Sequence, residues 1–479
     1  MLSFCARRYG VCSALVLLLA AWNLGYRLDR DIVQSWDEAI YGTTAAEILA
    51  SGDWIVTTFH DEVDYYNAKP PLNVWLITLS FAAFGINLVS LRLVSVLSAW
   101  LTILVVQWWC RRAIGASAAL AASLVLSTMF AFFFLHAGRS GNADAMFTLF
   151  ITLTAFALWR GEEHPFALVW IGPLLGLSFL LKGMAVLMPL AIVVLVLIAR
   201  GGLARREWSS MAAGVAVGVA GVGAWGAARY TADGWRFLHV LFSTDFVARV
   251  AEPLDGHGGG LLYYLNTLQR DHYDWLAAVA VVLTLAITCA GWARLRGDVL
   301  GVDRRFLRVI AIWGGVALVV PTAMSTKLGW YLNPLYPAFA IAVGWTMAWG
   351  LTALAGQASQ WRWRAAVAIV VLAGVVAEGK LLWYSHSHRS VRGTVQGLIL
   401  SGVEVTGARV VRQAWEHGDR FVLEHVRSGR AVTGSLGDYL ARGDPDALLL
   451  TGDPADPGRF VEVRREGRYA LYRRGARQD

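Results

Sequence analysis

The chain has 479 residues, of which 57% are hydrophobic and only 16% are charged. A soluble domain carries about a quarter charged residues, so this composition excludes an ordinary soluble protein and predicts a chain that lies mostly in lipid. The net charge of +8 does not indicate a nucleic-acid partner, because no basic patch is interleaved with base-stacking aromatic residues.

Apolar stretches recur along the chain, and each approaches the ~20 residues that a helix needs to cross a bilayer. They predict an all-α, multi-pass membrane protein with about eleven or more transmembrane helices. The predicted spans are 11–27, 89–110, 116–137, 145–160, 165–181, 184–199, 210–228, 274–293, 306–322, 330–350 and 365–384. The first is typical of a signal peptide too, but it lacks a clear cleavage site and many spans follow it, which favours a membrane helix.

The arginines predict the orientation, because cytoplasmic loops are enriched in basic residues. We predict that the chain lies in the inner membrane with its N-terminus in the cytoplasm. The basic residues that then lie on the cytoplasmic side are Arg111, Arg112, Arg160, Arg200, Arg205, Arg206, Arg294, Arg296, Arg304, Arg305, Arg308, Arg362 and Arg364. The segments 28–88, 138–144, 229–273 and 385–479 then lie outside, and in a bacterial envelope this outer side is the periplasm.

The apolar segment 70–84 is too short for an ordinary span, because about 20 residues are needed to cross the bilayer. If it crossed, every later loop would change sides and the arginines would lie outside. We therefore predict a helix that lies in or along the membrane on the outer side.

The first outer loop, 28–88, carries the strongest functional signal. Asp37 and Glu38 open a predicted amphipathic helix, and Tyr65, Tyr66 and Lys69 follow in the same loop. Carboxylates also suit the first turn of a helix because of its dipole, so a structural role for the pair stays open. The length of the loop favours function, since long ordered loops often bind substrates or carry catalytic residues.

Two further outer segments place charges at the membrane boundary, where charges are costly unless they are paired or functional. Arg139 and Asp144 lie in the first, where snorkelling of the arginine and capping of the next helix are the structural alternatives. Lys182 lies in the second, just before Gly183. It either caps a helical hairpin or binds an anionic phosphate.

The loop 229–273 and the segment after 322 complete the outer face. The loop contains Arg249 and His257, but it has no HExxH or similar spacing, so it gives only a weak metal signal. No cofactor is predicted, and a divalent cation stays open. Lys327 precedes a span and is followed by Tyr331, and aromatic residues here also fit an interfacial belt.

These outer segments together supply carboxylates, cations and aromatic rings beside lipid. Lysine or arginine stabilises the charge that develops on a phosphate leaving group, and a carboxylate takes the proton of an attacking hydroxyl. The sequence has no Walker A or GxGxxG motif. The pattern therefore favours a reaction between a lipid-borne phosphate donor and a polar acceptor.

The order of short motifs resembles a known family. W-D-E in the first loop is followed by K-P-P-L, by R-(x)4-D, by L-K-G and by K-(x)3-Y-L-x-P-x-Y-P. Over about residues 30–340 this order is similar to that of the membrane glycosyltransferases of the GT-C fold. It looks closest to the transferases that move aminoarabinose to lipid A, and to the related protein mannosyltransferases. The K-P-P form resembles the lipid A branch more.

The resemblance implies the site. The catalytic residues that it implies are Asp37, Glu38 and Asp144. The residues that it implies for the lipid phosphate or donor are Lys69, Arg139, Lys182, Lys327 and Tyr331. To the acceptor or substrate we assign Tyr65, Tyr66, Arg249 and His257.

The tail after about residue 389 changes character, and we predict a membrane domain over 1–388 and a small α/β domain over 389–479. The runs that look like strands are ARVVRQ, RFVLEHV, DALLLTG, RFVEVRR and YALYRR, with a helical patch at 433–442. This domain either covers the site and meets the acceptor or is a stabilising appendage.

The resemblance implies an inverting glycosyltransferase. It would move a sugar from a polyprenyl (undecaprenyl) phosphate to lipid A or another envelope glycan at the outer face of the membrane. Transfer to a protein hydroxyl, as in protein mannosyltransferases, is the first alternative. A lipid or sugar transporter is the second, but it predicts charges midway along spans, whereas the charges here gather at the ends.

Overall fold

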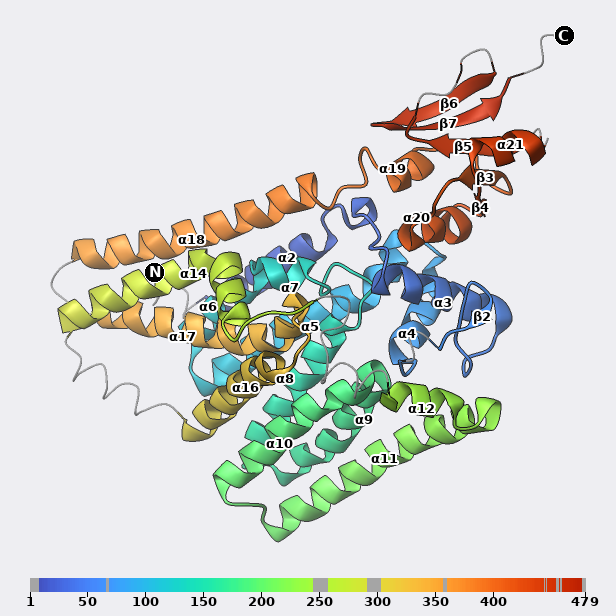
Figure 1. The fold of residues 1–479 in the computed structure, drawn as a ribbon. Helices are drawn as coiled ribbons and strands as arrows, with labels where there is room; N and C mark the ends of the chain where they lie inside the picture. Colours follow the sequence, from blue (N-terminus) through green and yellow to red (C-terminus); the bar gives the residue numbers. More distant parts are fainter. Residues whose placement is uncertain are drawn as a thin grey trace.

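The structure is a computed structural model, and it describes residues 8–65, 69–243, 257–290, 303–355, 360–442, 444, 446–453, 456 and 459–475. Figure 1 shows a bundle of long helices, with short elements and a small sheet domain gathered at one end of it. The helices of the bundle are α2 (Tyr9–Gly25), α5 (Leu88–Ala113), α6 (Ala116–Ser127), α7 (Phe130–Phe134), α8 (Asp144–Gly161), α9 (Ile171–Lys182), α10 (Leu187–Arg200), α11 (Arg205–Asp233), α14 (Tyr263–Ala290), α16 (Arg304–Ala323), α17 (Tyr336–Ala355) and α18 (Gln360–Ser387).

Eight stretches of the described residues are long and apolar enough to cross a membrane, which agrees with a multi-pass protein. Eleven spans were predicted, and four of them account for the difference: two are not among the eight, and two others fall within one stretch. The predicted span 116–137 breaks after Ser127, so that α6 has only 12 residues. The span 145–160 is helix α8, which is outside the eight. The spans 165–181 and 184–199 fall within one of the eight stretches.

That merged stretch is nevertheless two helices that meet at a break. Gly183 has a φ of +55° and begins the short 3-10 helix η3 (Gly183–Val186) between α9 and α10. Lys182, the last residue of α9, and Leu187, the first of α10, line the same pocket. Helix α9 therefore ends at this pocket, and α10 leads away from it.

Glycines allow α9 and α11 to pack closely. Gly172 and Gly176 of α9 face Gly214 and Gly218 of α11, and a Cβ atom on Gly172 would lie only 2.0 Å from the carbonyl oxygen of Gly214. Both pairs have the small-xxx-small spacing that lets membrane helices approach one another. This contact holds α9, and with it Lys182, in place.

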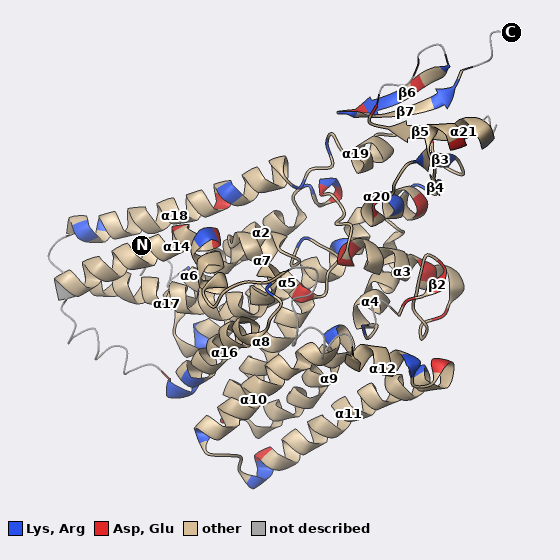
Figure 2. Cartoon of the chain, viewed as in Figure 1, with Lys and Arg blue, Asp and Glu red and all other residues tan. Residues whose placement is uncertain are grey.

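Basic residues gather at one end of the bundle. Figure 2 shows lysine and arginine at the ends of α10, α11, α16 and α18 that point away from the sheet domain. Some are held there by ion pairs, such as that of Arg305 with Glu163, with an Nη2–Oε1 distance of 2.8 Å. This ion pair therefore joins the start of α16 to the segment that follows α8.

The opposite end carries the elements of the first outer loop. They are α3 (Asp37–Ser51), the hairpin of β1 (Thr58–Phe59) and β2 (Glu62–Val63), and α4 (Leu72–Phe84). Helix α4 has 13 residues, a length of about 20 Å, against the ~30 Å thickness of the hydrocarbon core. The segment 70–84 is thus a helix and is not among the candidate spans, as predicted.

The sheet domain has five strands in the order β4-β3-β5-β7-β6. Strand β3 (Arg409–Arg412) pairs in parallel with β4 (Arg430–Thr433) and β5 (Leu448–Thr451). Strand β7 (Tyr469–Arg474) pairs antiparallel with β5 and β6 (Phe460–Glu466). Its helices are α19 (Val395–Leu400), α20 (His417–Phe421) and α21 (Leu436–Arg442). The predicted small α/β domain is confirmed.

One predicted strand of this domain is wrong. The run RFVLEHV forms α20 and a π-helical turn, Val422–Val426, instead of a strand. Its neighbouring apolar residues Phe421, Val422 and Leu423 are all buried. A short apolar run of this kind fits a buried helix as well as a strand, because periodicity cannot separate the two at this length.

The sheet domain packs directly on α3 (Figure 1). The side-chain amide of Gln396 accepts a hydrogen bond from the backbone N–H of Val33 at 2.8 Å and donates to its carbonyl at 2.9 Å. Phe421 lies against Gly42, where a Cβ atom would come within 2.7 Å of its ring. The domain therefore holds the segment that leads into α3.

Candidate active site

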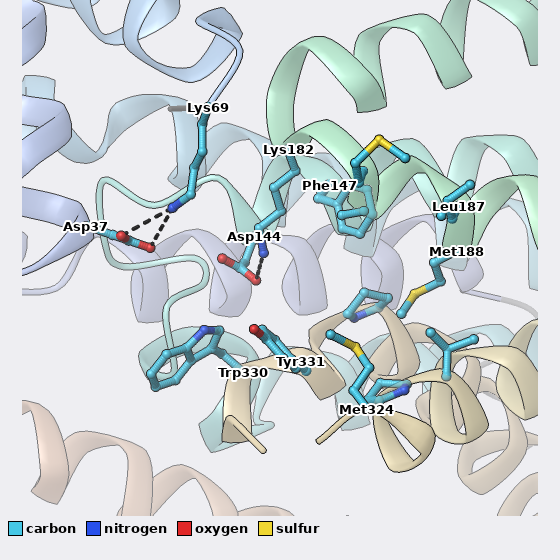
Figure 3. Close-up of a pocket in the computed structure, with 15 residues that line it drawn as sticks. Asp37, Lys69, Asp144, Phe147, Lys182, Leu187, Met188, Met324, Trp330 and Tyr331 are labelled. Carbon is cyan, nitrogen blue, oxygen red and sulfur yellow. Dashed lines mark hydrogen bonds and ion pairs between the residues drawn. The ribbon is translucent and has the colours of Figure 1, made fainter. Parts of the chain in front are cut away.

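A pocket of about 220 Å³ lies where the first outer loop meets the bundle. Its residues come from α3, α8, α9, η3, α10, α16 and the 3-10 helix η6 (Gly329–Leu335). Figure 3 shows a polar end with two lysine–carboxylate pairs and an apolar end with methionine and leucine side chains. The pocket is thus amphiphilic along its length.

Asp37 and Lys69 form the first pair. The Nζ of Lys69 lies 3.3 Å from both carboxylate oxygens of Asp37 and donates to the hydroxyl of Tyr41 at 2.9 Å. The side chain of Asp37 is 33% exposed. Burial raises the pKa of Asp37, but the charges of Lys69, His136 and Lys182 outweigh it and lower the pKa below its ordinary value. Asp37 is therefore ionised at neutral pH.

Asp144 and Lys182 form the second pair, with an Nζ–Oδ1 distance of 2.7 Å. Asp144 is the first residue of α8 and Lys182 is the last of α9. Each charge therefore suits the dipole of its own helix terminus. The pair is well shielded, with side chains 5% and 18% exposed.

An aromatic wall faces the two pairs. Trp330 and Tyr331 of η6 line the pocket below them (Figure 3). The ring of His136 stacks on Trp330, with 3.8 Å between the ring centroids. This stack fixes the indole at the polar end of the pocket.

The far end of the pocket is apolar. It is lined by Phe147, Met184, Ala185, Leu187, Met188, Val320, Pro321, Met324 and Pro334. A hydrocarbon chain would bury its surface there, at roughly 25 cal/mol for each Å² of apolar area removed from water.

Glu38 lies outside this pocket, although it neighbours Asp37. It is fully buried and forms an ion pair with Arg92, with an Nε–Oε1 distance of 2.8 Å and both side chains 0% exposed. It also accepts hydrogen bonds from the backbone N–H groups of Gln34 and Gly141. Burial raises the pKa of Glu38, but the charges of Arg92 and Arg389 outweigh this effect and lower the pKa below its ordinary value. Glu38 therefore stays charged. This carboxylate cannot reach a substrate in the pocket.

Arg139 and Lys327 also lie outside the pocket. Arg139 is buried, forms an ion pair with Asp31 and donates to the carbonyl oxygens of Asn23, Leu24 and Tyr26. The Nζ of Lys327 donates to the carbonyl oxygens of Pro321, Thr322 and Met324 at the end of α16. Both cations hold backbone in place, and the structure does not bring them to Asp37 and Asp144.

The residues that were assigned to the acceptor are dispersed. The hydroxyl of Tyr65 donates to Asp233 at 3.2 Å, near the end of α11. His257 is exposed, and its carbonyl accepts the backbone N–H of Lys327. Tyr66 and Arg249 lie outside the described residues. Neither Tyr65 nor His257 lines the pocket.

Sequence reasoning did not assign Trp330 to the site, nor Tyr41 and His136, which contact lining residues of the polar end. Tyr41 lies one turn after Asp37 and contacts Lys69. His136 has a φ of +54°, and its buried Nδ1 makes no hydrogen bond. Burial lowers its pKa, against the charges of Asp144 and Asp37. An aromatic residue four positions after a carboxylate on a helix was the available signal for Tyr41.

The described residues give no metal centre. None of their histidine, cysteine and carboxylate side chains form a group of three or more that could hold an ion. The two carboxylates of the pocket are each paired with a lysine. These lysine-paired carboxylates do not fit a divalent cation.

Comparisons with known proteins agree with the resemblance drawn from the sequence. A family described as dolichyl-phosphate-mannose-protein mannosyltransferase matches residues 68–225. The undecaprenyl phosphate-alpha-4-amino-4-deoxy-L-arabinose arabinosyl transferase 2 of Pseudomonas fluorescens is 28% identical over 356 residues, which cover 72% of this chain and 58% of the relative. The corresponding transferase of Pseudomonas aeruginosa is 28% identical, with 68% and 58% covered. The chain spans about three fifths of the length of these relatives.

Solved structures show the fold. ArnT from Cupriavidus metallidurans bound to undecaprenyl phosphate has a TM-score of 0.66 at 18% identity, with 97% of each chain covered. The archaeal oligosaccharyltransferase AglB from Archaeoglobus fulgidus has a TM-score of 0.50 at 14% identity, with 88% of this chain and 64% of that chain covered. The chain has the GT-C fold and is a multi-pass membrane protein.

Proposed function

We propose that this GT-C chain is a glycosyltransferase. It moves a sugar from a polyprenyl (undecaprenyl) phosphate to lipid A or another glycan of the cell envelope. The observation that carries the proposal is the amphiphilic pocket, in which Lys69 and Lys182 lie at one end and an apolar lining lies at the other. The names of the arabinosyl transferases and the lipid bound to ArnT support the same donor class.

The pocket matches a donor with a charged head and a hydrocarbon chain. Lys69 and Lys182 bind the phosphate and stabilise the charge that it gains when the sugar departs. Met184, Leu187 and Met188 meet the first part of the polyprenyl chain. Tyr331 and Trp330 line the same pocket and offer ring faces on which the sugar packs.

The transfer is an exchange at the anomeric carbon of the sugar. The acceptor hydroxyl forms a new C1–O bond while the bond from C1 to the phosphate oxygen breaks, and its proton passes to the carboxylate of Asp37. The products are the glycosylated acceptor and the polyprenyl phosphate. Asp144 positions Lys182 through their 2.7 Å contact.

Donor binding also adjusts Asp37. Lys69 holds the pKa of Asp37 low against the opposing effect of burial, and a carboxylate with a low pKa is a weak base. A donor phosphate competes for Lys69 and weakens this contact. The pKa of Asp37 then rises, and its carboxylate becomes a better base only when the donor is present.

The family match favours a second acceptor. Residues 68–225 match a family that is described by protein mannosyltransferases, so a protein hydroxyl is the alternative acceptor. Mass spectrometry of lipids and of exported proteins, from cells with and without this chain, separates the two. Loss of a sugar from the lipid fraction supports the proposal, and loss from proteins alone supports the alternative.

We infer that the chain lies in the inner membrane, with the N-terminus in the cytoplasm and the sheet domain in the periplasm. The gathering of arginines at one end of the bundle supports this orientation through the positive-inside rule (Figure 2). The pocket and the sheet domain then face the periplasm, where lipid A and exported proteins are accessible.

Asp37→Asn tests the catalytic assignment. We expect transfer to fall by at least about 100-fold, the size of a lost general base, while donor binding and Tm stay near those of the wild type. Asp29→Asn is the matched control, because Asp29 is an exposed carboxylate of the same loop. The transfer rates of the two variants are measured with purified protein in nanodiscs and a radiolabelled undecaprenyl-phosphate sugar. Near-native transfer by Asp37→Asn would exclude Asp37 as the base.

A further inference from the structure

Four aromatic rings gather beside Asp37 on the outer surface. Trp36 directly precedes Asp37, and its ring lies edge-on to His417 of the sheet domain at 6.3 Å between ring centroids. Phe59 and His60 of the hairpin lie 5.1 and 5.9 Å from the same His417 ring. The cluster thus joins α3, the hairpin and α20, and α20 lies over the start of α3 in Figure 1.

Trp36 is the exposed member of this cluster. Trp36 is 63% exposed, whereas Phe59, His60 and His417 are half-buried. A large exposed ring that packs edge-on against one neighbouring ring offers a flat apolar face to a ligand. Such a face is a place where a ligand can bind.

The surroundings of Trp36 are polar and point to a hydroxyl-bearing ligand. The hydroxyl of Ser35 donates to the carboxylate of Glu416 at 2.8 Å, on the side of the sheet domain. Asp37 follows on the other side, with its carboxylate in the pocket. Acceptors for ligand hydroxyl groups therefore lie on both sides of Trp36 along the chain and in the sheet domain.

We propose that Trp36, with Glu416 and His417, forms a subsite for a pyranose ring of the acceptor. The axial C–H bonds of a sugar face carry partial positive charge and pack on the negative face of an indole, while carboxylates accept its hydroxyl groups. The subsite lies at the N-terminal end of α3, where Asp37 is the first residue of the helix. This inference rests on the proposed function and narrows its acceptor to a glycan or glycolipid rather than a peptide.

Binding without turnover tests the subsite. The probe is a soluble glucosamine disaccharide, titrated calorimetrically into the full-length protein in nanodiscs. We expect Trp36→Ala to weaken its binding about tenfold, the equivalent of one lost ring contact, and Trp36→Phe to retain most of it. Trp235→Ala is the matched control, because Trp235 is 70% exposed, precedes α12 (Arg236–Phe242) and has its ring contact with Tyr230 of α11.

Kinetics then locate the effect. Trp36→Ala should raise the KM for lipid A about tenfold and leave the KM for the undecaprenyl-phosphate donor unchanged. The subsite is overturned if the wild type does not bind the disaccharide, or if Trp36→Ala binds it as tightly as the wild type does. If the wild type transfers no sugar at all, the proposed function fails, while the titration still decides the subsite.

Discussion

Two neighbouring carboxylates at the start of α3 have opposite environments. Successive residues of a helix point about 100° apart, so Asp37 faces the pocket while Glu38 faces the interior. Asp37 is partly exposed beside a lysine. Glu38 is fully buried against Arg92, whose guanidinium also donates to the carbonyl oxygens of Leu28, Asp31 and Ile32. Glu38 therefore holds the loop that carries Asp37.

We expect Glu38→Ala to destabilise the fold rather than the chemistry alone. The substitution leaves the buried charge of Arg92 without its partner, which costs about 3–5 kcal/mol. The Tm in detergent, followed by intrinsic fluorescence, should fall clearly below that of the wild type. Asp37→Asn keeps its hydrogen-bonding shape and should leave the Tm nearly unchanged.

Glu62→Ala is the control for this experiment, because Glu62 is an exposed carboxylate of β2 in the same loop. Its Tm should match that of the wild type. If Glu38→Ala melts at the wild-type temperature but has lost transfer, Glu38 acts in the reaction, and the structural role argued above is wrong.

The outer-loop charges and the family resemblance together indicated several residues of the pocket. Asp37, Lys69, Asp144, Lys182 and Tyr331 were predicted and all line the pocket, although their roles stay predictions. Arg139 and Lys327 were predicted with them, but their partners are mostly backbone carbonyl groups. A sequence shows the charge of a side chain and not the backbone that surrounds it, so it could not separate these two cations from the pocket lysines.

At the scale of the elements, most helix positions and the break at Gly183 were predictable, but two other departures from regular helix were not. The apolar windows located the long helices, and the length of 70–84 correctly indicated a helix too short to cross. The break after Ser127 and the π-helical run at Val422–Val426 depend on tertiary packing. Hydropathy carries no signal for such breaks.

We expect Gly172→Ala to disturb the contact of α9 with α11. The new methyl group would lie 2.0 Å from the carbonyl oxygen of Gly214, and such overpacking costs about 1–3 kcal/mol. Because α9 ends at Lys182, the helix shift should lower both the Tm and the rate of transfer. Thermal unfolding and the transfer assay measure the two effects.

The control for this substitution lies on the facing helix. Gly221 of α11 has nothing within 4 Å of the Cβ position, so Gly221→Ala should preserve both the Tm and the rate. Equal effects of the two substitutions would show that α9 and α11 do not approach one another as closely as the structure indicates.

At the scale of the whole molecule, the sheet domain and the first outer loop form one unit around the pocket. Gln396 binds the backbone of Val33, and His417 of the domain lies against His60 of the hairpin. The sequence predicted the domain and left its role open between a cover and an appendage. These contacts join residues more than 350 positions apart, which no local pattern could reveal.

The contact of the hairpin with α20, at His60 and His417, forms a joint between the first outer loop and the sheet domain. Its histidines make this joint sensitive to acid. Burial, followed by the charges of Arg420, His417 and His425, lowers the pKa of His60 from 6.5 to about 4, and Asp61 opposes them. Burial also lowers the pKa values of His417 and His425. Below pH 6.5 the unfolded chain therefore binds protons that the folded joint excludes. Stability is full above this pH and is lost as the pH falls towards about 4.

We expect His60→Asn to flatten this acid dependence. Asparagine tolerates the left-handed backbone at this position, where φ is +56°, and it does not titrate. The Tm of the wild type should fall between pH 7 and pH 4.5, and the fall should be smaller in the variant. His164→Asn, at an exposed histidine before the 3-10 helix Pro165–Trp170, is the matched control and should behave as the wild type. Hydrogen exchange at α20 locates the effect. Faster exchange there at low pH in the wild type, but not in His60→Asn, supports the role of the joint. Identical pH profiles of the two proteins would exclude His60 as the titrating group.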